Sequence, residues 1–182
     1  AYSATLLKHA IEIYDLAEKY RGDYTKAVPG AQGYYSSYSG FNDELAWGAM
    51  WLYRATGEES YYDKYKVIAD KEYSEYDRQK FTGCEEPISW DDKRAGAYVL
   101  AAVTTKDESR MKIAEKYADT IISQPKTPGG LWYSTVLSMW ASNRYAANGA
   151  SMIAIYANML PDSDAKRKKY VDFVKSQIDY IL

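Results

Sequence analysis

Hydrophobic residues recur at three- and four-residue steps near the start of the chain, which indicates an amphipathic helix. The apolar positions of this predicted helix are Leu6, Ala10, Ile13, Leu16 and Ala17. His9 falls on its polar side, so we expect that histidine at the surface. The period is lost across residues 22–42, which are rich in glycine and tyrosine. We therefore expect a long ordered loop there, of the kind that often carries function.

Pairs of helices follow this loop, and each pair consists of an apolar helix and then an amphipathic one. The expected helices begin at Asn42 and Glu59, at Trp90 and Asp107, and near Trp140 and at Ala165. Gly-Ala steps at 48, 96 and 149 repeat this unit with a period of about 50 residues,. Such hairpins close most economically as a ring of apolar helices inside a ring of amphipathic ones. The sequence thus predicts an all-α fold, an α/α toroid.

The number of hairpins bears on the extent of the domain. Three and a half hairpins do not close a six-hairpin ring, so residues 1–182 are expected to form a single segment of a larger domain, truncated at both ends. The apolar helices begin at Phe41–Glu44, Ile88–Lys93 and Leu137–Arg144. These beginnings are expected to gather at one end of the ring, and a functional site is expected there.

Composition narrows the classes of function. The 182 residues are 47% hydrophobic and 26% charged, as in ordinary globular proteins, and no apolar run is long enough to cross a bilayer,. The net charge of −2 offers no basic surface for nucleic acid,. One histidine and one cysteine, Cys84, argue against a zinc cluster and against histidine catalysis,. The 20 tyrosines and 5 tryptophans instead suit stacking on sugar rings,.

Oxygen-bearing residues cluster around the first apolar helix and suggest a cation site. Ser39 and Gly40 can offer backbone carbonyls, while Asp43 and Glu44 supply carboxylates. A carboxylate from Asp91, at the start of the next apolar helix, would complete a Ca²⁺ site,. The competing interpretation is a glycine-containing loop followed by an N-cap and an acidic first helical turn.

Aromatic residues form a second group of candidates. Trp140 and Arg144 stand at i and i+4, so on a helix both side chains would project from the same face,. They suit either sugar binding, through stacking and hydrogen bonds to hydroxyls, or a cation–π pair that caps a core. Tyr35 and Tyr38, three residues apart on the loop, would form a second stacking wall.

Two further pairs point away from catalysis. Trp47 and Trp51 lie in the middle of a predicted helix, where we expect core packing. Asp91 and Asp92 are adjacent, so their carboxylates point in different directions and make a poor acid and base for glycoside hydrolysis,. No catalytic dyad is evident in the sequence.

Several motifs in order resemble one known family. The segments Tyr35–Trp47, Trp51–Gly57, Trp90–Lys93 and Arg144–Asn148 resemble family 9 glycoside hydrolases, the inverting cellulases with an (α/α)6 barrel. The likeness extends over all 182 residues and corresponds to the middle of the family's catalytic domain, roughly two-fifths of it,. It implies an endo-β-1,4-glucanase that acts on cellulose or soluble β-glucan and is secreted.

The resemblance also implies roles for individual residues. Tyr35 would line the subsite next to the scissile bond, and Tyr38 stands where the family usually has tryptophan. Trp140 and Arg144 match residues on the product side of the cleft. Glu86 stands where the family has another tryptophan, so one aromatic subsite is missing or rebuilt.

Calcium and the missing catalytic groups follow from the same resemblance. Some members bind Ca²⁺ through residues that match Ser39, Gly40, Asp43, Glu44 and Asp91. The family's Asp-Ala-Gly-Asp motif, its late catalytic glutamate and its His-x-Arg segment do not occur in this sequence. We therefore expect no hydrolysis by the 182 residues alone, with cello-oligosaccharides and the remaining segments of the domain as partners,.

Two other interpretations remain open at the level of sequence. The chain can be a non-catalytic carbohydrate-binding α/α module, which predicts binding of cello-oligosaccharides that Trp140→Ala weakens. It can also be a helical-repeat scaffold whose tyrosines serve only packing, which predicts neither sugar binding nor a calcium-dependent melting temperature.

Overall fold

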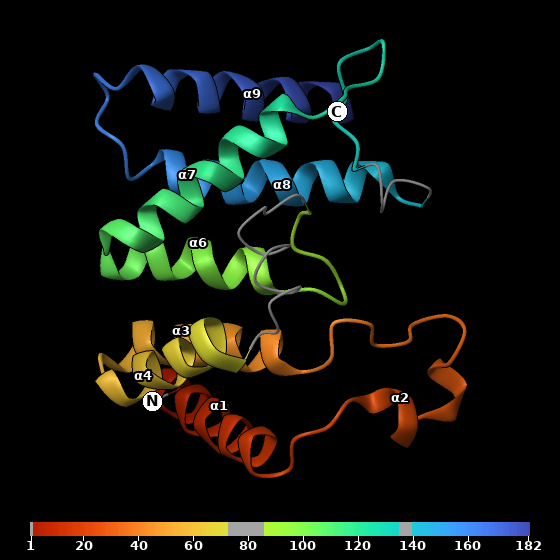
Figure 1. Ribbon diagram of the computed structural model, residues 1–182, viewed down its shortest axis with the longest axis vertical. Helices are drawn as coiled ribbons and strands as arrows, with labels where there is room; N and C mark the ends of the chain where they lie inside the picture. Colours follow the sequence, from red (N-terminus) through yellow and green to blue (C-terminus); the bar gives the residue numbers. More distant parts are fainter. Residues whose placement is uncertain (1, 73–85, 135–139) are drawn as a thin grey trace. The chain divides into compact units, whose positions relative to one another are not determined.

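The computed structural model describes residues 2–72, 86–134 and 140–182 (Figure 1). Regular structure in these ranges is helical, apart from one isolated bridge between Lys126 and Trp132. The predicted all-α class is therefore confirmed. Within the same ranges, no helix combines the length and the apolar character that crossing a membrane requires.

The chain divides into two compact units. The first unit comprises residues 1–74 and 90–97, and the second comprises residues 75–89 and 98–182. The described helices are α1 (Tyr2–Lys19), α2 (Tyr24–Ala27), the 3-10 turn η1 (Pro29–Ala31), α3 (Asn42–Thr56), α4 (Glu59–Val67), the π-helical turn η2 (Ile68–Glu72), α6 (Arg94–Thr105), α7 (Glu108–Ser123), α8 (Ser142–Ala157) and α9 (Ala165–Ile181).

A helical hairpin of α3 and α4 forms the centre of the first unit, and α1 packs on α3. The helix α3 ends at Gly57, whose left-handed backbone, with φ of 72°, closes the helix without a Cβ penalty,. Gly48 lets the ring of Tyr14 approach α3, because a Cβ there would lie 3.0 Å from the Tyr14 Cδ2 atom. The repeated glycine thus admits an aromatic ring from a neighbouring helix.

The packing of α1 differs from the prediction. The helix itself is present, but Leu6, Ile13 and Leu16 of the predicted apolar face are 52%, 66% and 59% exposed. Tyr14, which is 6% exposed, faces α3 instead. The helix has apolar residues on two sides, and hydrophobic periodicity alone does not say which side meets the rest of the first unit.

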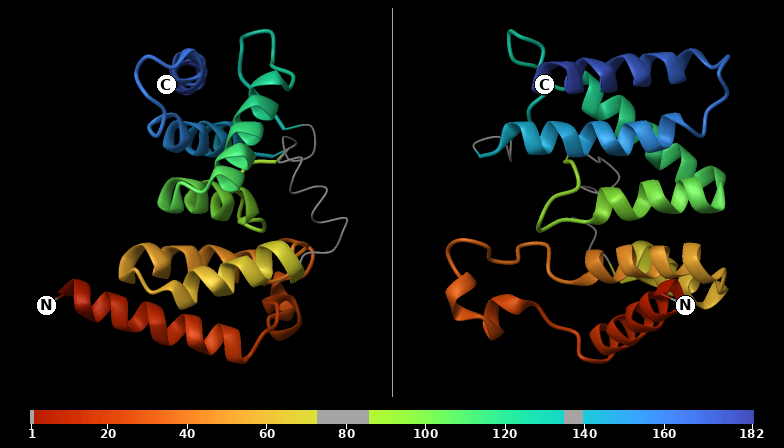
Figure 2. Two further views of the ribbon diagram at one scale, coloured as in Figure 1. Left: turned by 60° about the vertical axis from the view of Figure 1, so that its left-hand side comes forward. Right: turned by 180° about the vertical axis from the view of Figure 1, so that it is seen from behind.

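In the second unit, α8 and α9 lie side by side and α7 packs against both, as the two views of Figure 2 show. Gly149 of α8 repeats the role of Gly48, since its Cβ would lie 2.9 Å from the Trp132 ring. The amide of Gln177, fully buried on α9, accepts a hydrogen bond of 2.6 Å from the Trp132 backbone nitrogen. The segment between α7 and α8 is thereby tied to α9.

Other sequence predictions have mixed outcomes. His9 is exposed and contacts Glu12, as expected for a surface histidine. Residues 22–42 are not one continuous loop, since they contain α2 and η1. Trp51 is 47% exposed rather than buried in a core, and its ring meets the edge of Trp47. Cys84 and residues 137–139 lie outside the described residues.

Candidate functional site

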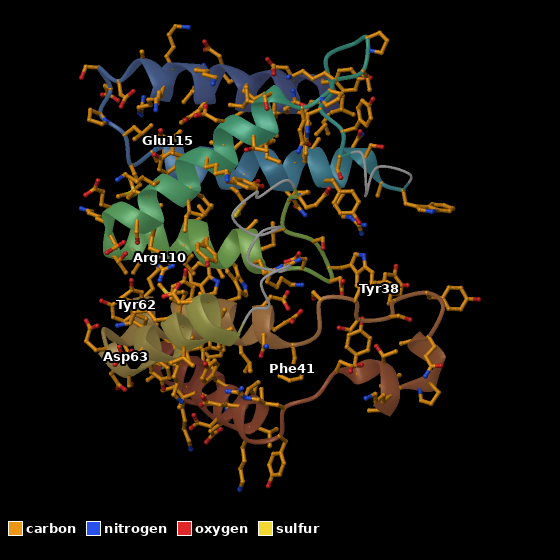
Figure 3. The ribbon with its side chains drawn as sticks, in the orientation of Figure 1. Tyr38, Phe41, Tyr62, Asp63, Arg110 and Glu115 are labelled. Carbon is orange, nitrogen blue, oxygen red and sulfur yellow. The ribbon has the colours of Figure 1, made fainter. Side chains whose placement is uncertain are left out.

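Three exposed tyrosines of the first unit, Tyr34, Tyr35 and Tyr38, stand on residues 33–40, which we call the aromatic loop. Tyr35 and Tyr38 are 57% and 80% exposed, and Figure 3 shows Tyr38 on the segment that leads into α3. Both rings meet Trp90 edge to face, with centroid distances of 5.2 and 6.4 Å. Trp90, which the sequence marks only as a helix start, therefore supports the predicted stacking wall.

The carboxylate of Asp91 holds the backbone of the aromatic loop. Its two oxygens accept hydrogen bonds from the backbone nitrogens of Tyr38, at 2.9 Å, and Ser39, at 3.1 Å. The Ser39 hydroxyl lies within hydrogen-bond distance of both the Asp91 carbonyl and the Asp43 carboxylate. Gly40 then turns the chain into α3 with φ of +84°,. The loop and the start of the next hairpin are thus joined directly.

Asp43 lies in the first turn of α3 but caps a different helix. The side chain is buried, with 1% of its surface exposed, and one of its oxygens accepts a 2.7 Å hydrogen bond from the Lys93 backbone nitrogen, just before α6. The N-cap of α3 is Phe41, which makes no side-chain capping bond. The predicted acidic first turn is present, and its buried member stabilises the start of the following hairpin.

The adjacent carboxyl groups of Asp43 and Glu44 affect each other's protonation. Burial raises the pKa of Asp43 above its usual range. Partial burial, together with the Asp43 carboxyl, raises the pKa of Glu44 to about 8. The Lys93 ammonium lies 3.6 Å from a Glu44 oxygen and also donates to the Trp90 carbonyl. The Lys93 ammonium thus faces Glu44, whereas Asp43 is bound by the Lys93 backbone nitrogen.

The predicted calcium ligands fit a cation in chemistry but only partly in placement. Among the described residues, no three Asp, Glu, His or Cys side chains are grouped so as to hold a metal ion. The Asp91 carboxylate is engaged by backbone amides rather than directed at the acidic pair. What remains is a set of hard oxygen donors, the carboxylates of Asp43 and Glu44 and the carbonyls beside them. These donors are of the type that Ca²⁺ takes, but both Asp43 oxygens already accept hydrogen bonds, from the Ser39 hydroxyl and the Lys93 backbone nitrogen.

Trp140 and Arg144 of the second unit are not paired as the sequence predicts. The helix α8 begins at Ser142, and Ala141 before it has a left-handed backbone with φ of 55°, so the two residues do not share a helical face. Trp140 is 81% exposed. The Arg144 guanidinium lies 4.6 Å over the ring of Tyr145 and donates to its hydroxyl. The cation–π partner of Arg144 is therefore Tyr145.

Asp92 and Glu86, the residue that stands in place of a family tryptophan, also have partners of their own. Asp92 accepts hydrogen bonds from the Arg94 backbone and guanidinium, whereas Asp91 binds the aromatic loop, so these adjacent carboxylates face different groups. In the second unit, Glu86 accepts a hydrogen bond from the buried Ser134 hydroxyl. Each of these three carboxylates thus accepts hydrogen bonds from neighbouring groups of the protein.

Comparison with known proteins identifies the family. The sequence profile of glycosyl hydrolase family 9 matches residues 1–182. The chain belongs to this family. It is 37% identical over 188 residues to endoglucanase B of Cellulomonas fimi, and the match covers 100% of this chain and 18% of that protein.

Solved endoglucanase structures share the fold of this chain over part of their own length. The endoglucanase of the termite Nasutitermes takasagoensis superposes with a TM-score of 0.83 at 34% identity, over 100% of this chain and 39% of that one. Endoglucanase CelQ from Clostridium thermocellum, complexed with cellotetraose, gives a TM-score of 0.83 at 35% identity, over 97% of this chain and 30% of that one. The predicted (α/α)6 barrel class is confirmed. The chain spans between 18% and 39% of the lengths of these three relatives.

Proposed function

We propose that the complete domain containing this chain hydrolyses β-1,4-glucan, cellulose in particular, as an inverting endoglucanase. Support comes from the family match over residues 1–182 and from relatives that are endoglucanases. The structural observation that carries the proposal is the aromatic loop, which exposes Tyr35 and Tyr38 while fixing their backbone. Exposed, fixed aromatic rings suit the apolar faces of a glucan chain.

In this proposal, the chain supplies part of the wall of the substrate cleft. Tyr35 and Tyr38 stack on glucose units, Trp140 offers a third exposed ring, and Arg144 donates hydrogen bonds to sugar hydroxyls. CelQ, whose structure contains cellotetraose, supports a β-1,4-linked oligosaccharide as the ligand class. Glu86 takes the place of one family tryptophan, so we expect less stacking at that subsite.

The chain does not contain the family's catalytic motifs, so the reacting carboxylates would come from other segments of the domain,. The exposed face of α1, with Leu6, Ile13 and Leu16, supports this arrangement. Apolar rows of this kind are normally covered in a folded domain. We propose that neighbouring helices of the barrel cover that face.

Release of reducing ends from carboxymethylcellulose tests the proposal. The full-length protein should hydrolyse it, the 182-residue chain should not, and full-length protein with Tyr35→Ala and Tyr38→Ala should bind cello-oligosaccharides more weakly. Hydrolysis by the pure 182-residue chain would contradict the proposal that the reacting carboxylates come from other segments of the domain. Binding without hydrolysis by the full-length protein would instead support the non-catalytic carbohydrate-binding module.

We also propose that Ca²⁺ binds beside Asp43 and Glu44, with the Ser39 and Gly40 carbonyls and Asp91 completing the site. The buried Asp43 carboxyl, the adjacent and more exposed Glu44, and the raised pKa of both groups support this proposal. When bound, the ion would supply structural charge compensation. Removal of calcium with a chelator should lower the melting temperature of the full-length protein, because an ion that binds only the folded state stabilises it. The Glu44→Gln variant should reduce this dependence, and an unchanged melting curve would count against the site.

Secretion forms part of the same proposal, since polymeric cellulose is hydrolysed outside the cell. We therefore expect the native protein in the culture medium rather than in the cell lysate. Immunoblotting of both fractions would test this expectation.

A further inference from the structure

The short helix α2 contacts the aromatic loop through two side chains that the sequence did not mark. The Tyr24 hydroxyl donates a hydrogen bond to the Tyr35 carbonyl. The Thr25 hydroxyl accepts a hydrogen bond of 2.8 Å from the Ser37 backbone nitrogen. One bond is made to residue 35 and the other to residue 37, so together they hold the backbone on both sides of residue 36.

The helix α2 is itself anchored, so it can serve as a support. Asp23 caps it by accepting a hydrogen bond of 2.9 Å from the Thr25 backbone nitrogen. The Thr25 hydroxyl also lowers the pKa of the Asp23 carboxyl through a side-chain hydrogen bond. Gln32 donates to the Thr25 carbonyl at 3.1 Å, which joins α2 to the turn that follows it.

Two sets of residues in the first unit therefore hold the aromatic loop. Asp91 binds the backbone nitrogens of Tyr38 and Ser39, while α2 binds the Tyr35 carbonyl and the Ser37 nitrogen. The rings of Tyr35 and Tyr38 stay exposed although this backbone is fixed. A surface ordered before binding loses less conformational entropy when a ligand arrives.

We propose that Tyr24 and Thr25 are positioning residues of the glucan site, which set the geometry of the Tyr35 and Tyr38 rings without touching the sugar. This inference rests on the proposed function and deepens it. Loss of the α2 contacts leaves both tyrosine side chains chemically unchanged, but the backbone that carries them is no longer held. Binding of oligosaccharides that reach the aromatic loop then weakens, whereas the chemical step is unaffected.

The test compares matched variants of the full-length enzyme. Tyr24→Phe removes only the hydroxyl that binds the Tyr35 carbonyl, and Thr25→Val removes the hydroxyl that binds the Ser37 nitrogen while preserving side-chain shape. Thr25→Ser restores that hydroxyl. Tyr20→Phe is the control, because it makes the same chemical change at an exposed tyrosine, 66% exposed, beyond the end of α1.

The readouts are KM and kcat for cellotetraose, with melting temperature measured alongside. The Tyr24→Phe, Thr25→Val double variant should raise KM about tenfold and leave kcat within about twofold. This pattern is expected when binding of the substrate and binding of the transition state are weakened equally. Thr25→Ser should return KM toward the wild-type value, and Tyr20→Phe should have no effect. An unchanged KM in the double variant would overturn the inference, as would a fall in kcat and melting temperature at constant KM.

The wild-type enzyme separates this inference from the proposed function. If wild-type enzyme neither binds nor hydrolyses cellotetraose, the proposed function fails and the inference fails with it. If wild-type enzyme hydrolyses cellotetraose and the double variant has the same KM, only the positioning role of Tyr24 and Thr25 fails.

Discussion

The aromatic loop and the start of α8 both present exposed aromatic side chains, but the structure supports them differently. Tyr35 and Tyr38 stand on a backbone bound by Asp91 and α2, and their rings contact Trp90. Trp140 lies before α8, follows no helical geometry and is 81% exposed. In the first region hydrogen bonds hold the backbone beneath the rings, whereas in the second Trp140 stands outside α8 and only Arg144 belongs to that helix.

This difference shows that a loop without regular structure can be held by more hydrogen bonds than residues at the start of a helix. The aromatic loop is fixed by hydrogen bonds between its backbone and side chains outside it. The position of Arg144 instead depends on Tyr145 and on the packing of α8. Perturbing polar contacts should therefore affect the first region, and perturbing core packing the second.

The largest effect is expected for Asp91→Ala in the full-length protein. The variant leaves the backbone nitrogens of Tyr38 and Ser39 without their acceptor. Two charge-assisted bonds are lost, so we expect a fall of about 3 kcal/mol in the free energy of unfolding. Affinity for cellotetraose, measured by calorimetry, should fall at least about tenfold, which corresponds to about 1.4 kcal/mol.

A control separates this effect from calcium. If Asp91 acts through the aromatic loop, the loss of affinity in Asp91→Ala should persist when wild type and variant are compared in chelator. Equal affinities of the two proteins in chelator would assign the effect to the ion instead.

The next effect tests the packing of α8. Gly149→Ala would place a Cβ 2.9 Å from the Trp132 ring, so either the ring or the helix must shift. Overpacking of this kind costs about 1–3 kcal/mol, measurable by thermal or urea unfolding. Gly22→Ala is the matched control, because no atom lies within 4 Å of its added Cβ. A Gly149→Ala variant as stable as wild type would show that α8 packs more loosely than described.

A smaller effect compares the two aromatic regions directly. Tyr38→Ala should weaken cellotetraose binding more than Trp140→Ala, even though tryptophan is the larger ring. The Tyr38 backbone is ordered in advance, whereas ordering a free side chain on binding costs about 0.5–1.5 kcal/mol. Calorimetry on both variants checks this order, and a larger loss for Trp140→Ala would reverse the comparison.

The smallest effect is expected for Arg144→Lys. Lysine keeps the charge but loses the planar group that lies over Tyr145 and donates to its hydroxyl,. The free energy of unfolding should fall by about 0.5–1 kcal/mol, the range of an exposed cation–π contact. Arg54→Lys, in the last turn of α3, provides a comparison for the same substitution on another helix. A fall as large as that for Gly149→Ala would contradict this order.

The sequence predicts the helices well because their periodicity and ends have local causes. Gly57 closes α3 and Asp107 caps α7, and both signals lie within a turn of the boundary,. The sequence does not show that Tyr14, rather than Leu6, Ile13 and Leu16, faces α3, because that depends on which of two apolar rows meets α3. The sequence also does not reveal why the glycine is repeated. The ring of Tyr14 approaches Gly48, and the ring of Trp132 approaches Gly149, only in the folded chain.

The sequence predicts which residues belong to the candidate site better than it predicts how they are arranged. Tyr35, Tyr38 and Asp91 do come together, through hydrogen bonds and ring contacts across more than fifty residues of sequence. Tyr24 and Thr25 carry no recognisable motif, since a tyrosine and a threonine in a polar segment are common. Ala141 breaks the expected pairing of Trp140 and Arg144, and a left-handed alanine has no signal in the sequence,.

The polar contacts of Asp43 have a consequence for how such a domain evolves. Asp43 binds the Lys93 nitrogen 50 residues further on, and Asp119 binds Lys169, also 50 residues further on. Each of these two bonds spans one repeat and links a hairpin to the next one along the chain. Deleting one hairpin by recombination would strand a buried carboxylate such as Asp43, at a cost of about 1–3 kcal/mol or more. Family members are therefore expected to diverge by changing loops while keeping the number and order of their hairpins.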